Sequence, residues 1–239
     1  MLDFVVENLP RFLGGALITV GYAAISCAAG FVAAIPLALM RLSSNPVTSW
    51  LSTIYVLFFR GTPLLAQIFL IYYGSGQFRP FLDSIGLWTL FREPWFCALL
   101  SLSLNTAAYT SEILRGAIQS IPTGEVEAAV ASGMSRTQRL IHIILPRAMG
   151  LAWPAYTNEV VYQIQATSLV SIITVMDITG VARVIASRYF TFYESFLTAA
   201  VLYLIIVYAF TIIARRIEIR LQAHLGTVPA IRQTAGGAR

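Results

Sequence analysis

Residues 12–40 read FLGGALITVGYAAISCAAGFVAAIPLALM, an apolar run without a charged residue that lies between Arg11 and Arg41. A helix needs about 20 mainly apolar residues to cross the hydrocarbon core of a bilayer, so this run is long enough to span it. Further windows of this kind follow at residues 50–73, 95–114, 151–173 and 195–214. The sequence therefore predicts an all-α, polytopic membrane protein with about five transmembrane helices.

The composition favours the same fold class. Hydrophobic residues make up 57% of the 239 residues and charged residues only 11%, whereas soluble domains carry about 25% charged residues. No change of composition marks a second domain, and Gly, Pro and charge concentrate between the windows. We therefore expect one transmembrane domain over residues 1–239, with a short polar tail at residues 217–239.

The arginines are distributed unevenly between the segments that join the windows. If the C-terminus lies inside the cell, the inner segments hold ten Arg and the outer segments five. Because positive residues are enriched on the cytoplasmic side, we expect the N-terminus to lie outside the cytoplasm and the C-terminus inside it. The net charge of +5 is spread over these segments and forms no single basic patch, which argues against nucleic-acid binding.

All sixteen basic residues are Arg, and the chain contains no Lys. A Walker A loop requires Lys on the nucleotide phosphates, and Schiff-base chemistry requires a reactive amine, so both are excluded. We expect no catalytic residue and no cofactor in this chain; if ATP drives it, another chain hydrolyses the ATP. We also expect no metal site, because the Cys and His residues lack companions at ligand spacing: Cys27, Cys97, His142 and His224.

The loop of residues 119–146, QSIPTGEVEAAVASGMSRTQRLIHIILP, separates the third and fourth windows. Thr123 is expected to cap a short helix with acids in its first turn, and Gly133 to end that helix. Ser135 and Gln138 form a capping-box pattern for a second short helix. The physics alone allows either an ordinary amphipathic connector or a docking element for another protein.

The spacing within this loop resembles the EAA motif of permease subunits in binding-protein-dependent ABC importers. The resemblance implies a coupling helix that seats in a groove of an ATPase subunit, with Glu127 in the contact and Gly133 at the corner. The matching positions are Glu127, Ala128, Ala129, Gly133, Ile143, Leu145 and Pro146.

Further segments look like the polar amino-acid permeases, over about residues 12–220, and the Asn158-Glu159-Val160 variant is most similar to the M-type subunit of histidine/lysine/arginine/ornithine or opine importers. The resemblance implies a second, homologous permease subunit, a periplasmic substrate-binding protein, and an ATPase dimer that binds ATP and Mg. The segments are RGTPLLAQIFLIYYG, LNTAAYTSEILRGAIQSIPTGEVEAA, PAYTNEVV and ATSLVSI, at residues 60–74, 104–129, 154–161 and 166–172.

Polar side chains within the windows are candidates for a substrate site, because ionisable groups inside a membrane face the protein interior or a water-filled path. Glu159 is the leading candidate for substrate contact, since a buried carboxylate suits a guanidinium or ammonium group. The alternative role for Glu159 is an interhelical hydrogen bond or an ion pair with Arg60. The other candidates are Asn158, Tyr162, Gln163, Asn105 and Arg60.

Three other features have two readings. Arg60, followed by Gly61 and Pro63, indicates either a pathway contact with a substrate carboxylate or a structural kink. A polar stripe follows one helical face of the third window and ends at Glu112. Glu112 either contacts substrate or pairs with Arg115. The stripe consists of Ser101, Asn105, Tyr109 and Glu112. We expect the charges of the outer loop to be solvated, with a periplasmic gate as the alternative: Asp177, Arg183 and Arg188.

We therefore interpret the chain as the permease of an importer for a basic amino acid (arginine, lysine, histidine or ornithine) or an opine. A permease for glutamine or glutamate is the alternative, and a secondary carrier a weaker one. A membrane-embedded enzyme is disfavoured because no catalytic cluster is present. An ATPase subunit should co-purify with an importer permease, and not with a carrier or an enzyme.

Overall fold

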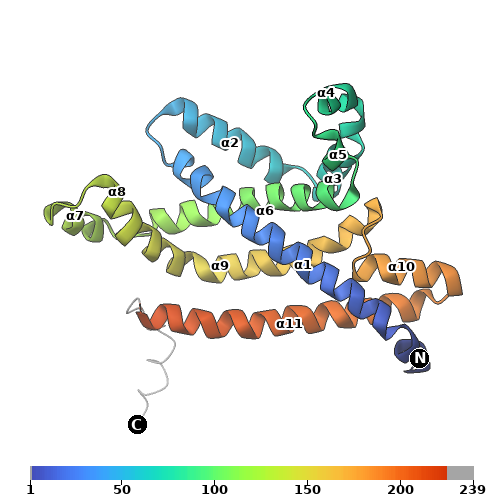
Figure 1. The fold of residues 1–239 in the computed structure, drawn as a ribbon. Coiled ribbons are helices and arrows are strands. Elements are labelled where there is room, and N and C mark those ends of the chain that lie inside the picture. The colour runs from blue at the N-terminus through green and yellow to red at the C-terminus, as the bar shows by residue number, and fades with distance from the viewer. Residues whose placement is uncertain (1, 225–239) are drawn as a thin grey trace, which may run out of the picture.

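The computed structural model describes residues 2–224, in which every regular element is helical (Figure 1). The predicted all-α class is confirmed. Four long helices run alongside one another, and they contain four of the five predicted windows in whole or in large part. They are α1 (Leu2–Arg41), α6 (Pro94–Gln119), α9 (Leu145–Ala166) and α11 (Phe192–His224).

Two helical stretches of the described chain, Phe4–Arg41 and Phe192–Arg220, are each long and apolar enough to cross a membrane alone. Two bent pairs raise this number to four if each pair counts as one span, namely 46–61 with 64–84 and 136–173 with 178–189. The count of five therefore stays a prediction.

The second window is divided at the predicted interruption. Helix α2 (Pro46–Gly61) begins after Asn45, whose side chain accepts from the Val47 N–H, and helix α3 (Leu64–Tyr72) follows Pro63. The helical segments on either side of the break lie at 105° to each other. A proline without an N–H donor ends α2, but the turn is far sharper than a kink within one helix.

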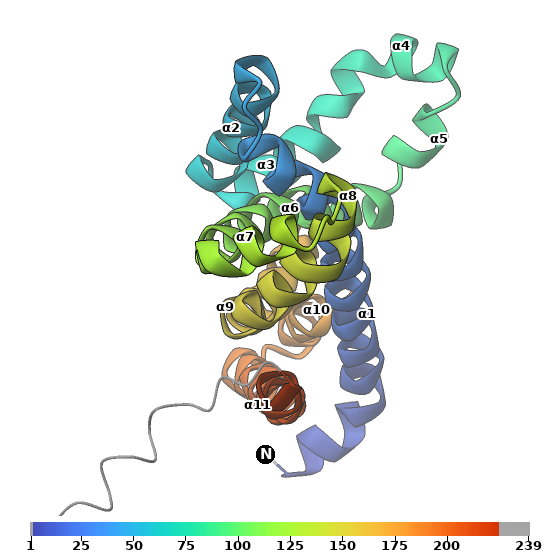
Figure 2. The ribbon, with the colours of Figure 1, turned by 90° about the vertical axis from the view of Figure 1, so that its left-hand side faces the viewer.

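A segment of three short helices outside the bundle connects α3 to α6. It contains η1 (Gly74–Phe78), α4 (Arg79–Ser84) and α5 (Trp88–Phe91), and Figure 2 shows it projecting away from the long helices.

Close helix contacts hold the bundle together. Gly30 of α1 lies against α6, where an added Cβ would come within 2.3 Å of the Thr106 methyl carbon. Small residues of three helices form one core cluster near the loop end, among them Ala34, Ala117 and Ala148. Small side chains let helix backbones approach closely in a membrane protein.

The loop after α6 is partly as predicted. Helix α7 (Thr123–Ala131) ends before Gly133, which has a φ of +77°, and Ser135 and Gln138 form the predicted capping box of α8 (Arg136–Arg139). The N-cap prediction was wrong: the cap position is Pro122, and no side chain caps α7.

The prediction that the second short helix is separate from the fourth window was also wrong. A π-helical turn, η2 (Leu140–Ile144), joins α8 directly to α9. The helical backbone therefore continues from the loop into the fourth predicted window.

The outer-loop prediction failed for Asp177, which lies between η3 (Thr167–Ile173) and α10 (Ile178–Tyr189) and is completely buried. Its carboxylate accepts from the Gly180 N–H at 2.8 Å and from the Tyr203 hydroxyl at 2.7 Å. Arg183 and Arg188 have exposed side chains, and Arg183 also donates to the Ser171 carbonyl at 2.6 Å. Asp177 therefore stabilises the contact between α10 and α11 and the start of α10.

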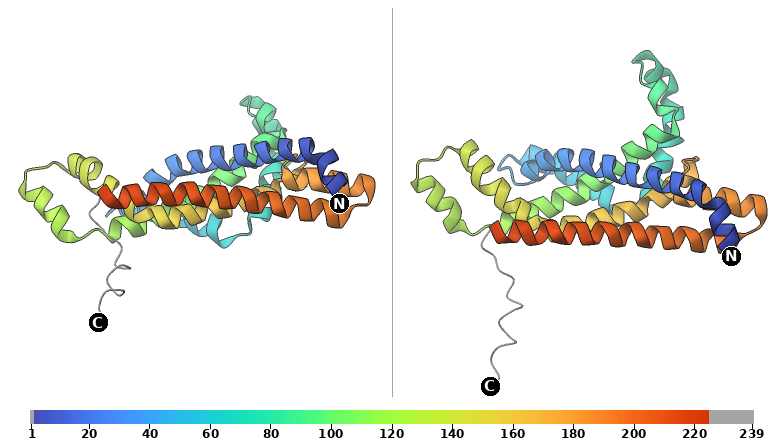
Figure 3. Two further views of the ribbon diagram at one scale, coloured as in Figure 1. Left: turned by 90° about the horizontal axis from the view of Figure 1, so that it is seen from below. Right: turned by 60° about the horizontal axis from the view of Figure 1, so that its bottom comes forward.

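The described ends of the chain lie at opposite ends of the bundle, and α7 and α8 extend beyond the end at which α11 finishes (Figure 3). The predicted polar tail began at residue 217, but α11 continues as a helix to His224. The remainder of the predicted tail, residues 225–239, lies outside the described residues.

Candidate functional site

A cavity of about 600 Å³ lies between the α2–α3 break, α6 and α9. Its wall combines one carboxylate, one guanidinium and several uncharged polar groups. The lining residues are Arg60, Gly61, Thr62, Pro63, Leu64, Asn105, Tyr109, Glu159, Tyr162, Gln163 and Ala166.

Glu159 is the carboxylate of this wall, and only 8% of its surface is exposed. Its Oε1 accepts a hydrogen bond of 3.0 Å from the Thr106 hydroxyl of α6, and no ion pair to Arg60 is formed within the described chain. The predicted interhelical hydrogen bond is therefore present. One side of the carboxylate is held by α6, and the residue still lines the cavity.

Gln163 lies one turn further along α9 and is also buried. Its amide donates to the Ser26 hydroxyl at 2.9 Å and to the Leu102 carbonyl at 3.1 Å. These bonds connect α9 to both α1 and α6, so the wall of the cavity is fixed by three helices.

The sequence analysis missed Gln67, which is 2% exposed. Its amide nitrogen donates to the carbonyls of Phe59 and Thr62 at 2.9 and 3.0 Å, and its oxygen accepts from Asn105 at 3.0 Å. Carbonyls freed where a helix ends need such partners inside a membrane. A lone Gln in an apolar run four residues after Pro63 was the available signal.

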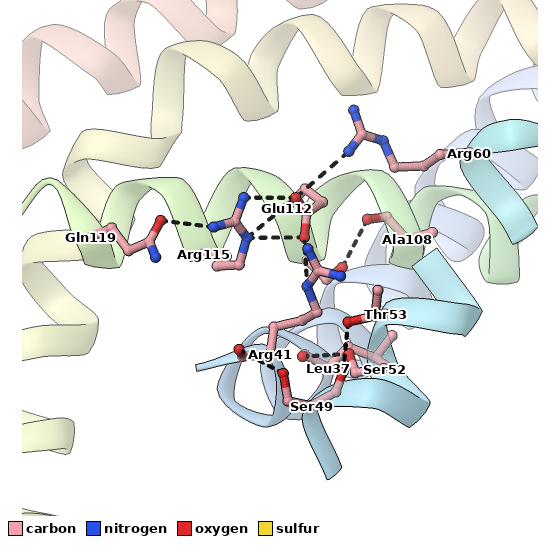
Figure 4. A network of polar contacts seen from close by, with 11 residues as sticks. Leu37, Arg41, Ser49, Ser52, Thr53, Arg60, Ala108, Glu112, Arg115 and Gln119 are labelled. Atoms are coloured by element: carbon pink, nitrogen blue, oxygen red, sulfur yellow. Dashed lines mark hydrogen bonds and ion pairs between the residues drawn. The ribbon is translucent and has the colours of Figure 1, made fainter. Parts of the chain in front are cut away.

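Arg60 lies at the end of α2, and its guanidinium is 5.2 Å from the centre of the Tyr109 ring. One nitrogen is 3.7 Å from Glu112, and the side chain is 44% exposed. Glu112 also binds Arg115 at 2.9 Å and Arg41 at 3.2 Å (Figure 4). The predicted pair of Glu112 with Arg115 is thus present, and two more Arg join it.

The remaining candidates occupy different positions. Asn105 and Tyr162 line the cavity, although Tyr162 is largely exposed. Asn158 is exposed and does not belong to the lining, although Tyr162, one turn further along α9, does. Five of the six predicted residues therefore meet at one cavity.

The loop residues form a second candidate surface. Glu127, Ala128 and Gly133 are exposed, whereas Ala129 is buried. Of the motif's last two positions, Leu145 is half-buried and Pro146 exposed. The helix α7 is bound to the base of α9 by an ion pair of 3.2 Å between Glu125 and Arg147.

This geometry is suited to binding and to transmitting motion. The cavity offers an anionic and a cationic group on separate helices, and both are held by neighbouring side chains. Within residues 4–220, no three His, Cys, Asp or Glu residues are grouped so that they could hold a metal ion. A zwitterionic or cationic small molecule fits this chemistry.

Comparison with known proteins agrees with this description. Residues 28–223 match the family described as binding-protein-dependent transport system inner membrane component. The chain is 46% identical, over 98% of its length and 99% of the relative's, to the nopaline transport system permease protein NocM of Agrobacterium fabrum. It is 43% identical, over 73% and 78% of the two chains, to the arginine ABC transporter permease protein ArtM of Escherichia coli K12.

A solved structure has the same fold. A chain of an amino acid ABC transporter crystallised with histidines superposes with a TM-score of 0.81 at 28% identity, covering 92% of this chain and 98% of that one. With the family match, the identity to full-length relatives and the shared fold, this chain belongs to the family of inner membrane components of binding-protein-dependent transport systems.

Proposed function

We propose that this chain is a permease subunit of an ABC importer that carries a basic amino acid or an arginine-derived opine into the cytoplasm. The observation that carries the proposal is the single acidic side chain, Glu159, in the wall of the 600 Å³ cavity. Relatives named for nopaline and arginine transport support the same substrate class.

In this proposal the two charges of the cavity bind opposite ends of the substrate. The Glu159 carboxylate, held by Thr106, receives the guanidinium or ammonium of the substrate side chain. Arg60, whose ion pair with Glu112 is loose at 3.7 Å, receives the α-carboxylate. Charge-assisted hydrogen bonds of this kind are about twice as strong as neutral ones. Asn105, Tyr162 and Gln163 supply polar contacts along the wall.

ATP and Mg would be bound and used by a partner ATPase dimer, not by this chain. The exposed Glu127, Ala128 and Gly133 would contact that ATPase, and Ala129, Leu145 and Pro146 would support the loop. The Glu125–Arg147 ion pair and the continuous path from α8 into α9 would pass the motion to the helix that carries Glu159.

The proposed assembly also contains a second, homologous permease subunit and a periplasmic substrate-binding protein. It sits in the bacterial inner membrane, with the N-terminus of this chain in the periplasm and its C-terminus in the cytoplasm.

Reconstitution of this chain with its second permease, ATPase and binding protein in proteoliposomes tests the proposal. We expect arginine, ornithine, lysine, histidine or nopaline to stimulate ATP hydrolysis and to accumulate, and glutamate to do neither. Stimulation by glutamine or glutamate alone would replace the proposed substrate class, and uptake without any ATP hydrolysis would indicate a secondary carrier.

A further inference from the structure

A second cavity, of about 430 Å³, lies beside the large one. The two share Arg60, Gly61 and Tyr109, so they are adjacent along α6. Asn105 lines the first cavity and Glu112 the second. At about 1.5 Å of rise per residue, these two residues are about 10 Å apart along α6. The second cavity therefore lies closer to the loop of residues 119–146. The second cavity is lined by Arg41, Thr53, Val56, Leu57, Arg60, Gly61, Tyr109 and Glu112.

The lining of the second cavity carries a positive net charge. Among the residues that the structure describes, Glu112 is the single acidic group within ion-pair distance of the guanidiniums of Arg41, Arg60 and Arg115 (Figure 4). Arg41 and Arg60 line the cavity together with Glu112, so the lining has an excess of one positive charge. Charge in a partly desolvated site is costly unless a partner of opposite sign is bound.

The contacts of Glu112 are divided unequally among the three Arg residues. Arg115 donates to both carboxylate oxygens at 2.9 to 3.2 Å, and Arg41 lies 3.2 Å from one of them. Arg60, at 3.7 Å, makes the loosest contact. Both oxygens of Glu112 are therefore already occupied, and the side chains of Arg41 and Arg60 also line the second cavity.

We propose that Arg41, which lines the second cavity beside Arg60, forms a subsite for a second carboxylate of the substrate and so selects N-carboxyalkyl derivatives of arginine over arginine itself. This inference rests on the proposed function, in which Glu159 holds the guanidinium in the adjoining cavity. Opines of the arginine type keep that guanidinium and carry at least one more carboxylate than arginine. The excess positive charge of the second cavity matches this added negative charge.

Arg115 provides a matched control. It binds Glu112 more closely than Arg41 does, and it carries the same charge, but it does not line either cavity. Its guanidinium is also held by the Gln119 side chain at 2.8 Å. Loss of charge at residue 115 thus disturbs Glu112 without removing a group from the proposed subsite.

The test compares Arg41→Gln and Arg115→Gln in the complete reconstituted transporter, with nopaline and arginine as the two substrates. The measured quantity is the ratio of nopaline uptake to arginine uptake at low concentration, so a general loss of transport cancels. We expect the ratio to fall about tenfold or more in Arg41→Gln, since a hydrogen bond to a charged group is worth about one factor of ten or more. It should stay near the wild-type value in Arg115→Gln, and largely recover in Arg41→Lys.

An unchanged ratio in Arg41→Gln, or an equal fall in both Gln variants, would overturn the subsite. Wild-type transport of arginine without nopaline would also overturn it, while leaving the proposed function intact. If the wild-type transporter takes up neither compound and also no ornithine, lysine or histidine, the proposed function itself fails, and the subsite falls with it. Co-purification of the ATPase with each variant verifies that the assembly has formed.

Discussion

The Thr106 hydroxyl donates a hydrogen bond of 3.0 Å to the Glu159 carboxylate, and this bond joins α6 to α9 at the wall of the large cavity. The carboxylate is thereby oriented by a neutral donor, and it forms no ion pair with a guanidinium of the described chain. In the proposed function a cationic ligand supplies that ion pair, and this leads to the first prediction.

Glu159→Gln should lower arginine uptake at low concentration by about tenfold or more, because the substitution removes the charge and keeps an oxygen that can accept from Thr106. Assembly with the ATPase should be unaffected. The neighbouring Asn158→Ala, on the exposed side of α9, should transport normally. Unchanged arginine uptake in an assembled Glu159→Gln transporter would refute the substrate role of this residue.

Gly30→Ala should destabilise the bundle by about 1–3 kcal/mol, the usual cost of overpacking a close contact. The added methyl group would approach the Thr106 methyl carbon to 2.3 Å and the Ser103 carbonyl to 3.1 Å. Thermal unfolding in detergent measures the effect. Gly21→Ala, on the same helix with nothing within 4 Å of its Cβ, is the matched control and should not lower the unfolding temperature.

Loss of the Glu125–Arg147 ion pair should change coupling more than stability. The side chains are 36% and 20% exposed, and such partly exposed pairs contribute about 1 kcal/mol or less to folding. Arg147→Glu should therefore lower the amount of substrate carried per ATP hydrolysed. The double variant Glu125→Arg with Arg147→Glu should recover part of the loss, and a double variant no better than Arg147→Glu would argue against a direct link.

Tyr203→Phe should lower the free energy of unfolding by about 1–3 kcal/mol, because it removes one donor from a fully buried carboxylate. The lost bond is the 2.7 Å contact from the Tyr203 hydroxyl to Asp177. Tyr208→Phe, on the same helix but 67% exposed, should have no measurable effect. Denaturant or thermal unfolding of both variants compares them, and equal stabilities would show that Asp177 does not depend on this donor.

Several features were predictable from the sequence because their causes are local. Hydrophobic length predicted the long apolar helices, since each residue contributes separately to transfer into a bilayer. The capping box at Ser135 and the turn at Gly133 depend on neighbouring residues alone. The absence of Lys excluded whole classes of chemistry without any structure.

The cavity was only partly predictable. Polar groups within apolar windows directed attention to Glu159, Gln163, Asn105 and Arg60, which do line it. Helical periodicity could not separate Asn158 from its neighbour, because the face that α9 turns to the cavity depends on the helices packed against it. Gln67 was missed for the same reason. The backbone carbonyl of Phe59 that accepts from it lies near the end of α2, where the chain turns by 105°.

The sequence by itself determined that this protein is built from apolar helices, and where its polar loop and its candidate charges lie, because these properties are sums over neighbouring residues. The tertiary structure alone decided the partners of those charges. Arg60 lies beside Glu112 and not beside Glu159, and Asp177 is buried instead of solvated. Electrostatic interactions and burial depend on distances between segments far apart in the chain, and only the packed bundle fixes those distances.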